Sequence, residues 1–141
     1  ADSSAVFISN RTGVWRSRDR GVNWANLDFP KFTDIFYSRG VESAPNDPDT
    51  LYACVGLNFG SKQGGVMRST DQGDTWERFD KGIRPTSTTF GVAINEHAPE
   101  QVYFCTRDGE VYGTRDGGES WTSHALPEMA GNVKAIACAS A

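Results

Sequence analysis

Several features are scarce in this sequence, and each scarcity excludes a class of protein. No apolar run is long enough to span a bilayer, and no signal-peptide pattern is evident. Acidic residues outnumber basic ones by 18 to 14. That balance disfavours a nucleic-acid module, because phosphate binding needs a dominant basic face. We therefore expect neither a membrane nor a nucleic-acid partner.

Cysteine is also scarce, with Cys54, Cys105 and Cys138 as the only three. An odd, sparse count is not a disulfide framework. No CxxC pair is present, and neither histidine is spaced from a cysteine as zinc ligands are. We therefore expect no metal and no cofactor. Cys54 and Cys105 fall at the same place in two predicted strands, which favours packing over nucleophilic catalysis.

A helical period is missing as well, whereas glycine is plentiful at 15 residues, as in chains rich in tight turns. One motif occurs three times: "SRDRGVNW" at 17–24, "STDQGDTW" at 69–76 and "TRDGGESW" at 114–121. The copies begin 52 and 45 residues apart. These spacings are typical of a β-propeller blade of four strands.

Each octet is predicted to form the turn between the third and fourth strands of a blade. The aspartates should accept hydrogen bonds from backbone N–H groups of their own turn. The glycines can adopt the positive φ that ends such a turn. The tryptophans should bury their rings between adjacent sheets. The residues assigned these structural roles are Asp19, Gly21, Trp24, Asp71, Gly73, Trp76, Asp116, Gly118 and Trp121.

The S/T-x-D-x-G-x-x-W pattern resembles the Asp-box (BNR) repeat family, and the resemblance covers essentially the whole chain. That family includes sialidases, sortilin-like receptor domains and xyloglucan-degrading enzymes. The overall sequence is similar to the C-terminal half of bacterial Asp-box propellers. The resemblance implies an all-β propeller in which the octets lie at the blade periphery, away from the ligand.

The strands predict three blades' worth of an antiparallel propeller, half of a six- or seven-bladed ring. Blade 1 spans about 1–34 without its inner strand, blade 2 about 35–85, blade 3 about 86–128, and a closing inner strand 132–140. Three blades do not close a ring. Two completions stay open: a homodimer, or a complementary propeller half from the same longer polypeptide.

The candidate ligand site lies on the face built by the loops between the second and third strands and between successive blades. Those loops hold a group of cationic and polar residues suited to a carboxylate, phosphate or sulfate. The group consists of Arg39, Arg11, Arg107, Tyr37, Arg84, Lys62 and Asn58. The alternative is that its cations are solvated or pair with Asp34, Asp80 and Asp108.

Two functions follow from these observations. The first is a non-catalytic propeller that binds a partner protein, an anionic glycan or a small molecule on its loop face. The second is a propeller glycoside hydrolase or lyase, resembling sialidases, that acts on an anionic substrate near the axis. No Arg-Ile-Pro motif is present, and the catalytic residues stay unassigned. A paired-carboxylate mechanism would draw on Asp34, Glu42, Asp80 and Asp108.

Overall fold

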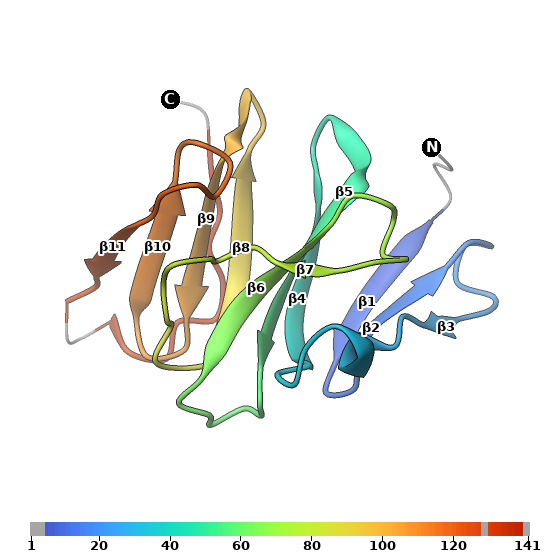
Figure 1. Cartoon of the computed structure of the whole chain (residues 1–141), viewed down its shortest axis with the longest axis horizontal. Helices are drawn as coiled ribbons and strands as arrows, with labels where there is room; N and C mark the ends of the chain where they lie inside the picture. Colours follow the sequence, from blue (N-terminus) through green and yellow to red (C-terminus); the bar gives the residue numbers. More distant parts are fainter. Residues whose placement is uncertain (1–4, 128–129, 140–141) are drawn as a thin grey trace.

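The computed structural model describes residues 5–127 and 130–139, and it contains three antiparallel sheets that lie side by side (Figure 1). Blade 1 consists of β1 (Val6–Asn10), β2 (Gly13–Ser17) and β3 (Ala25–Asn26). The short 3-10 helix η1 (Phe29–Lys31) follows it. Blade 1 therefore lacks the inner strand that the other two sheets have.

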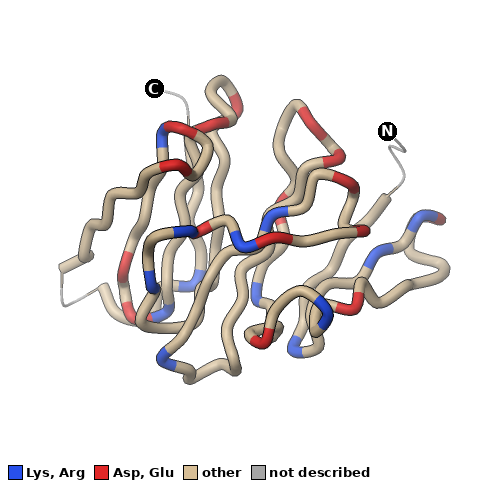
Figure 2. The backbone as a smooth tube through the Cα atoms, viewed as in Figure 1, with Lys and Arg blue, Asp and Glu red and all other residues tan. Residues whose placement is uncertain are grey.

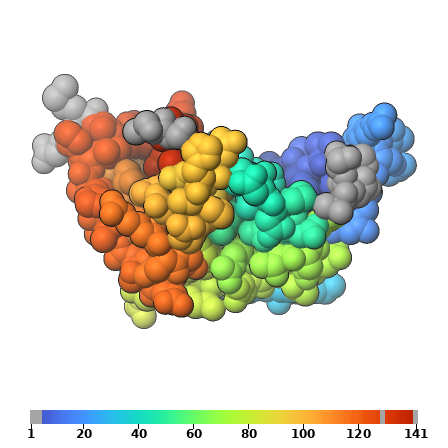
Figure 3. Space-filling model, turned by 90° about the horizontal axis from the view of Figure 1, so that it is seen from above, coloured from blue at the N-terminus to red at the C-terminus, as the bar shows by residue number. Residues whose placement is uncertain are grey.

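Blades 2 and 3 each have four strands in chain order from the inner edge outward. Blade 2 consists of β4 (Tyr37–Ala44), β5 (Asp47–Gly56), β6 (Gly64–Ser69) and β7 (Glu77–Arg78). Blade 3 consists of β8 (Thr89–Asn95), β9 (Ala98–Thr106), β10 (Glu110–Thr114) and β11 (Thr122–Ala125). Seen from above, the three blades form a shallow crescent (Figure 3).

Two apolar cores hold the blades together, and each lies between two neighbouring sheets. The alternation of strand side chains sends every second residue into one core and the rest into the other. In β5, Leu51, Ala53 and Val55 join the core between blades 1 and 2, whereas Tyr52 and Cys54 join the core between blades 2 and 3. Burial on both faces explains why this strand reads as a nearly continuous apolar run.

The predicted closing strand at 132–140 does not form within the described residues. Residues 133–139 make no strand, although the Val133 N–H donates to the Arg107 carbonyl at 3.2 Å. The segment still lies against the inner strand of blade 3, since a Cβ added at Gly91 would be 3.1 Å from the Ile136 backbone nitrogen. A strand needs a ladder partner, and no second strand of a further blade runs beside this segment.

Nowhere in the described part of the chain is there a helix long and apolar enough to cross a membrane. Within the same residues, no three His, Cys, Asp or Glu side chains gather as metal ligands would.

Candidate functional site

The three octets fold as self-contained turns, and the same hydrogen bonds recur in each. Asp71 accepts from the Thr75 N–H at 2.8 Å, and the Ser69 hydroxyl donates to Asp71 at 2.7 Å while accepting from the Gly73 N–H at 2.8 Å. The bonds from Asn23 and Ser17 lower the pKa of Asp19 to about 2. The octet aspartates are therefore charged, saturated acceptors, which suits a structural role.

The octet tryptophans differ in burial, and the prediction was wrong for one of them. Trp76 is 6% exposed, and its ring lies 4.7 Å from that of Phe29. Trp121 packs edge-on against Phe79 of the preceding blade at 5.4 Å. Trp24 is 36% exposed. Its ring lies on the open face of blade 1, because no blade of this chain precedes that face.

In the loops at the opposite end of the blades from the octets, basic residues outnumber acidic ones. Figure 2 shows Lys and Arg along the lower edge of the arc, whereas the tips at the upper edge are mainly acidic. The lower edge is built by residues 11–12, 57–63 and 107–109 between strands of one blade, and by residues 27–36 and 79–88 between blades. We call this end the loop face, and it holds the predicted site residues.

At the start of the inner strands, two irregularities bring Arg39 and Phe90 together. The ladder register shifts between Ser38 and Gly40 in β4, and between Thr89 and Gly91 in β8. Arg39 and Phe90 are therefore bulge residues at equivalent places, and bulges commonly re-aim a side chain next to a functional site. The Arg39 guanidinium carbon lies 5.1 Å from the centre of the Phe90 ring.

Phe59 lies at the centre of the resulting cluster. Its ring is 54% exposed and stands 5.5 Å from the Phe90 ring. The guanidinium of Arg39 lies 5.7 Å from the centre of the Phe59 ring, and that of Arg107 lies 5.9 Å away. Arg107 also donates to the Phe59 carbonyl at 3.1 Å. An exposed aromatic ring is thus held between two cations from different blades.

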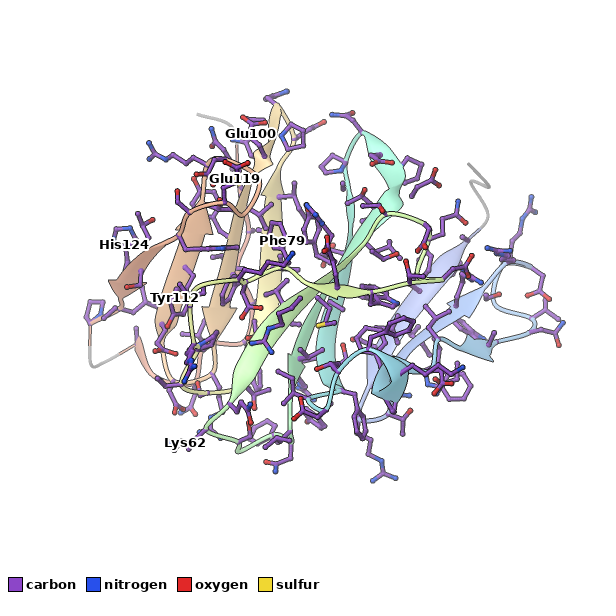
Figure 4. The ribbon with its side chains drawn as sticks, viewed as in Figure 1. Lys62, Phe79, Glu100, Tyr112, Glu119 and His124 are labelled. Carbon is purple, nitrogen blue, oxygen red and sulfur yellow. The ribbon has the colours of Figure 1, made fainter. Side chains whose placement is uncertain are left out.

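The loop at 57–63 is fixed by its own side chains. The Asn58 amide oxygen accepts from the Gly60 N–H at 2.9 Å, and the Asn58 carbonyl accepts from the Thr88 hydroxyl at 2.6 Å. Lys62, at the lower left in Figure 4, binds Asp108 at 3.2 Å. The loop therefore presents Phe59 from a constrained backbone rather than from a free tip.

Asp108 determines which of the predicted cations are already paired. It binds Arg107 at 2.8 Å and Lys62 at 3.2 Å, and these side chains, Arg107 first, lower its pKa. Among the described residues, Arg39, Arg11 and Arg84 form no ion pair. The prediction that these cations pair with carboxylates thus holds for part of the group.

The remaining predicted residues lie in two separate pockets. Arg11, Tyr37 and Arg39 line one pocket together with Asn10 and Trp15, between blade 1 and the inner strand of blade 2. Arg84 lies in the other pocket, which Lys62, Arg78 and Lys81 also line. The structure therefore brings Arg39 and Arg107 to Phe59, with Tyr37 beside Arg39 and Asn58 next to Phe59 in the chain. Arg11 lies in the pocket beside Arg39, whereas Lys62 lines the pocket that holds Arg84.

The four candidate carboxylates have different surroundings, and Asp34 is exposed in the loop between blades 1 and 2. Asp80 is buried and accepts two bonds from Arg78, one of them at 2.9 Å. Asp108 is paired as described. Loss of solvation raises the pKa of Glu42, which lies on β4. A raised pKa favours the protonated form that a general acid needs.

The two cysteines at equivalent places are buried in the sheets. Cys54 and Cys105 are 0% and 1% exposed, and burial is the main cause that raises the pKa of each thiol. A protonated, inaccessible thiol is neither a nucleophile nor a metal ligand.

Phe59 and Phe90 were missed by the sequence reasoning, which considered only charged and polar residues at the site. The available signal was an aromatic residue inside the longest loop of the loop face, "GLNFGSKQGG" at 56–65. An exposed aromatic there is a binding signal rather than a packing one.

Together, the three blades, the octet turns and the crescent define a segment of a β-propeller built from BNR-type repeats, as predicted. The sequence pattern of the Sortilin-Vps10 family (sortilin, neurotensin receptor 3) matches residues 64–139, more than half of the chain. The chain belongs to that family.

Similar sequences and solved structures extend the comparison. The chain is 28% identical over 138 residues to a xyloglucanase of Paenibacillus sp, covering 86% of this chain and 13% of that protein. An ancestral GH74 enzyme superposes with a TM-score of 0.67 at 17% identity, covering 86% of this chain and 17% of that one. YCF48 from Cyanidioschyzon merolae superposes at 0.62 and 20% identity, covering 86% of this chain and 36% of that one. The chain thus spans a small part of each of these proteins.

Proposed function

We propose that the loop face binds a glycan, and that the chain forms part of a propeller glycoside hydrolase acting on a xyloglucan-type polysaccharide. The observation that carries this proposal is the exposed Phe59 ring between Arg39 and Arg107. The likeness to a xyloglucanase over most of the chain supports it. The glycosidase reading is therefore preferred to the non-catalytic scaffold.

The chemistry of the cluster matches a sugar chain. A β-linked glucose ring has an apolar face of C–H groups, which packs on an aromatic ring, and a rim of hydroxyls that need hydrogen-bond partners. Phe59 supplies the ring, while Arg39 and the Tyr37 hydroxyl supply polar partners beside it. The pocket lined by Arg11 and Trp15 continues this surface toward blade 1. We therefore assign Phe59 as the stacking platform and Arg39 as its principal donor.

Hydrolysis of a glycosidic bond ordinarily needs two carboxyl groups. Asp80 and Asp108 are engaged by Arg78 and Arg107, and Asp108 also binds Lys62. Among the described carboxyl groups, Glu42 has a pKa raised by loss of solvation, and it lies on β4 three residues after Arg39. In the proposal Glu42 is the general acid, with the second carboxylate supplied by another part of the ring.

A second candidate function is the binding of an anionic ligand without catalysis. The pocket formed by Lys62, Arg78, Lys81 and Arg84 favours it, because Arg84 has no carboxylate partner among the described residues. This pocket lies apart from Phe59, so the two candidates use different residues.

Isothermal titration calorimetry with a xyloglucan-derived oligosaccharide separates the two candidates. Phe59→Ala should weaken binding at least about tenfold, because it removes the stacking surface. Phe59→Trp should retain binding, whereas Phe59→Leu should not, since an apolar side chain without a ring cannot stack. Arg84→Ala should leave this affinity unchanged.

Two results would contradict the glycan proposal. One is binding of the oligosaccharide that is unaffected by Phe59→Ala. The other is no binding of it together with binding of a sialylated or uronic oligosaccharide that Arg84→Ala abolishes. The second outcome would support the anionic-ligand candidate instead.

A further inference from the structure

The open face of blade 1 corresponds residue for residue to faces that are buried in blades 2 and 3. Positions on the third strands and in the octets are matched by counting from the first residue of each octet, and positions on the second strands by their ladder partners there: Val6, Leu51 and Val102 pair with Ser17, Ser69 and Thr114. The open-face residues Val6, Ile8 and Trp24 are 42%, 43% and 36% exposed. Their counterparts lie in the two cores: Leu51, Ala53 and Trp76 in the first, and Val102, Phe104 and Trp121 in or against the second. In blades 2 and 3 the preceding blade covers this face, so blade 1 lacks its cover.

A second relationship repeats at each junction between blades. The third residue after an octet tryptophan packs on the octet glycine of the next blade. A Cβ added at Gly73 would be 2.6 Å from the Leu27 Cδ1, and one added at Gly118 would be 2.7 Å from Phe79. At Gly21 an added Cβ would meet only the Trp24 ring, at 3.7 Å. Within the described residues, no side chain from a preceding blade therefore packs on Gly21.

Blade 3 carries the matching face at the other end of the arc. Its residues Tyr103, Cys105 and Val111 repeat Tyr52, Cys54 and Val66 of blade 2, which face the core between blades 2 and 3. Tyr103 and Val111 are partly exposed, whereas Cys105 is 1% exposed. His124 occupies the place of Leu27 and Phe79. It lies on the outer side of β11, away from blade 2 (Figure 4).

The polar positions at the two ends match as well. Arg16 of blade 1 binds Asp74 in the octet of blade 2 at 2.8 Å. The corresponding residues at the open ends are Gly113 on blade 3 and Val22 on blade 1, which is 77% exposed. Contact between Gly113 and Val22 would therefore bury no charged side chain without an ion-pair partner at this position.

The inner edges of blades 1 and 3 also match: one lacks a neighbouring segment and the other has one to offer. A Cβ added at Gly40 would lie 3.2 Å from the Phe90 carbonyl oxygen, where β8 passes blade 2. Gly91 meets residues 135–136 in the same way on blade 3. Residues 133–139 therefore lie in the position of a following inner strand, and β1 is an edge strand that lacks an inner strand.

We propose that a second copy of this chain covers both open faces, so that two copies close a six-bladed ring. Residues 133–139 of each copy pair with β1 of the other, and each His124 packs on Gly21 of the other copy. The contact is head-to-tail and occurs twice around a twofold axis, which closes the ring and gives β1 a neighbour on its free edge. This inference is independent of the ligand on the loop face.

The test is the solution mass of the full chain, by light scattering after size exclusion. The expected mass is twice 15.4 kDa. Ile8→Glu combined with Val22→Glu should return the mass of one chain, because charge placed in an apolar interface raises the dissociation constant at least about 100-fold. Leu57→Glu, at a residue 52% exposed on the loop face, is the control and should keep the doubled mass.

His124→Glu, on the far blade, distinguishes a head-to-tail ring from a dimer that uses only blade 1. The ring predicts that this variant also dissociates. The proposal would be overturned if the unaltered protein had the mass of one chain at about 100 μM, which is 100 times a micromolar dissociation constant. So would a doubled mass that survives either the Ile8/Val22 or the His124 change. Circular dichroism of each variant shows that its sheets are intact.

Discussion

The ring of Phe79 in blade 2 lies on Gly118 in the octet of blade 3, so closely that a Cβ added at Gly118 would be 2.7 Å from the ring. Gly118 also has a φ of +94°, which disfavours any other residue. Conformation and packing thus both require glycine at one position. The octet is therefore a junction between blades as well as a turn within one.

Gly118→Ala tests this double requirement. The substitution should lower the free energy of unfolding by about 2–4 kcal/mol, because it combines backbone strain with overpacking against Phe79. Gly117→Ala is the matched control, since its φ is +70° and an added Cβ would meet nothing within 4 Å. It should cost only about 1 kcal/mol. Equal losses for the two variants, measured by urea denaturation, would contradict the packing account.

The octet tryptophans should differ in their contribution to stability as they differ in burial. Trp76→Ala removes a ring that is 6% exposed and packs on Phe29, and it should cost about 3–5 kcal/mol. Trp24→Ala should cost far less in the single chain, because that ring faces solvent. Thermal unfolding at a concentration where the protein is monomeric measures both. A large loss for Trp24→Ala under those conditions would show that its ring is covered within the chain.

Stability should fall in acid through the octet aspartates. Hydrogen bonds, first from Asn23 and Ser120 respectively, lower the pKa of Asp19 and of Asp116 to about 2, from 3.8. The unfolded chain therefore binds more protons between these values, so their stabilisation is complete above about pH 4 and is lost as the pH falls through 2. Asp19→Asn with Asp116→Asn should flatten this part of the curve of unfolding free energy against pH. An unchanged acid transition in the double variant would assign it to other groups.

The repeat made most of the fold predictable from the sequence. The spacing of Trp24, Trp76 and Trp121 defined the blades, because a turn that satisfies its own hydrogen bonds has a strict local pattern. The segment at 132–140 was predicted as an inner strand from its place after the last copy of the repeat. That prediction was wrong for the described residues, since a strand also depends on a partner that local sequence does not supply.

The site was less predictable, because it is assembled from loops of two blades. Arg39 was predicted to begin an inner strand and lies near the start of β4, but its contact with Phe90 depends on bulges in both β4 and β8. Phe59 joins them through a loop whose shape is set by Asn58 and Thr88. Such contacts between distant segments follow from tertiary packing and have no local pattern.

The most direct test of the central claim is an NMR titration of the ¹⁵N-labelled chain with a xyloglucan-derived oligosaccharide. The account predicts shifts in the amides of residues 37–39, 57–63 and 107–108, with no shifts in the three octets at the opposite end of the blades. Phe59→Ala should abolish those shifts while leaving the rest of the spectrum intact. Shifts confined to the octets, or to residues 81–86 around Arg84, would contradict the assignment of Phe59 as the glycan platform.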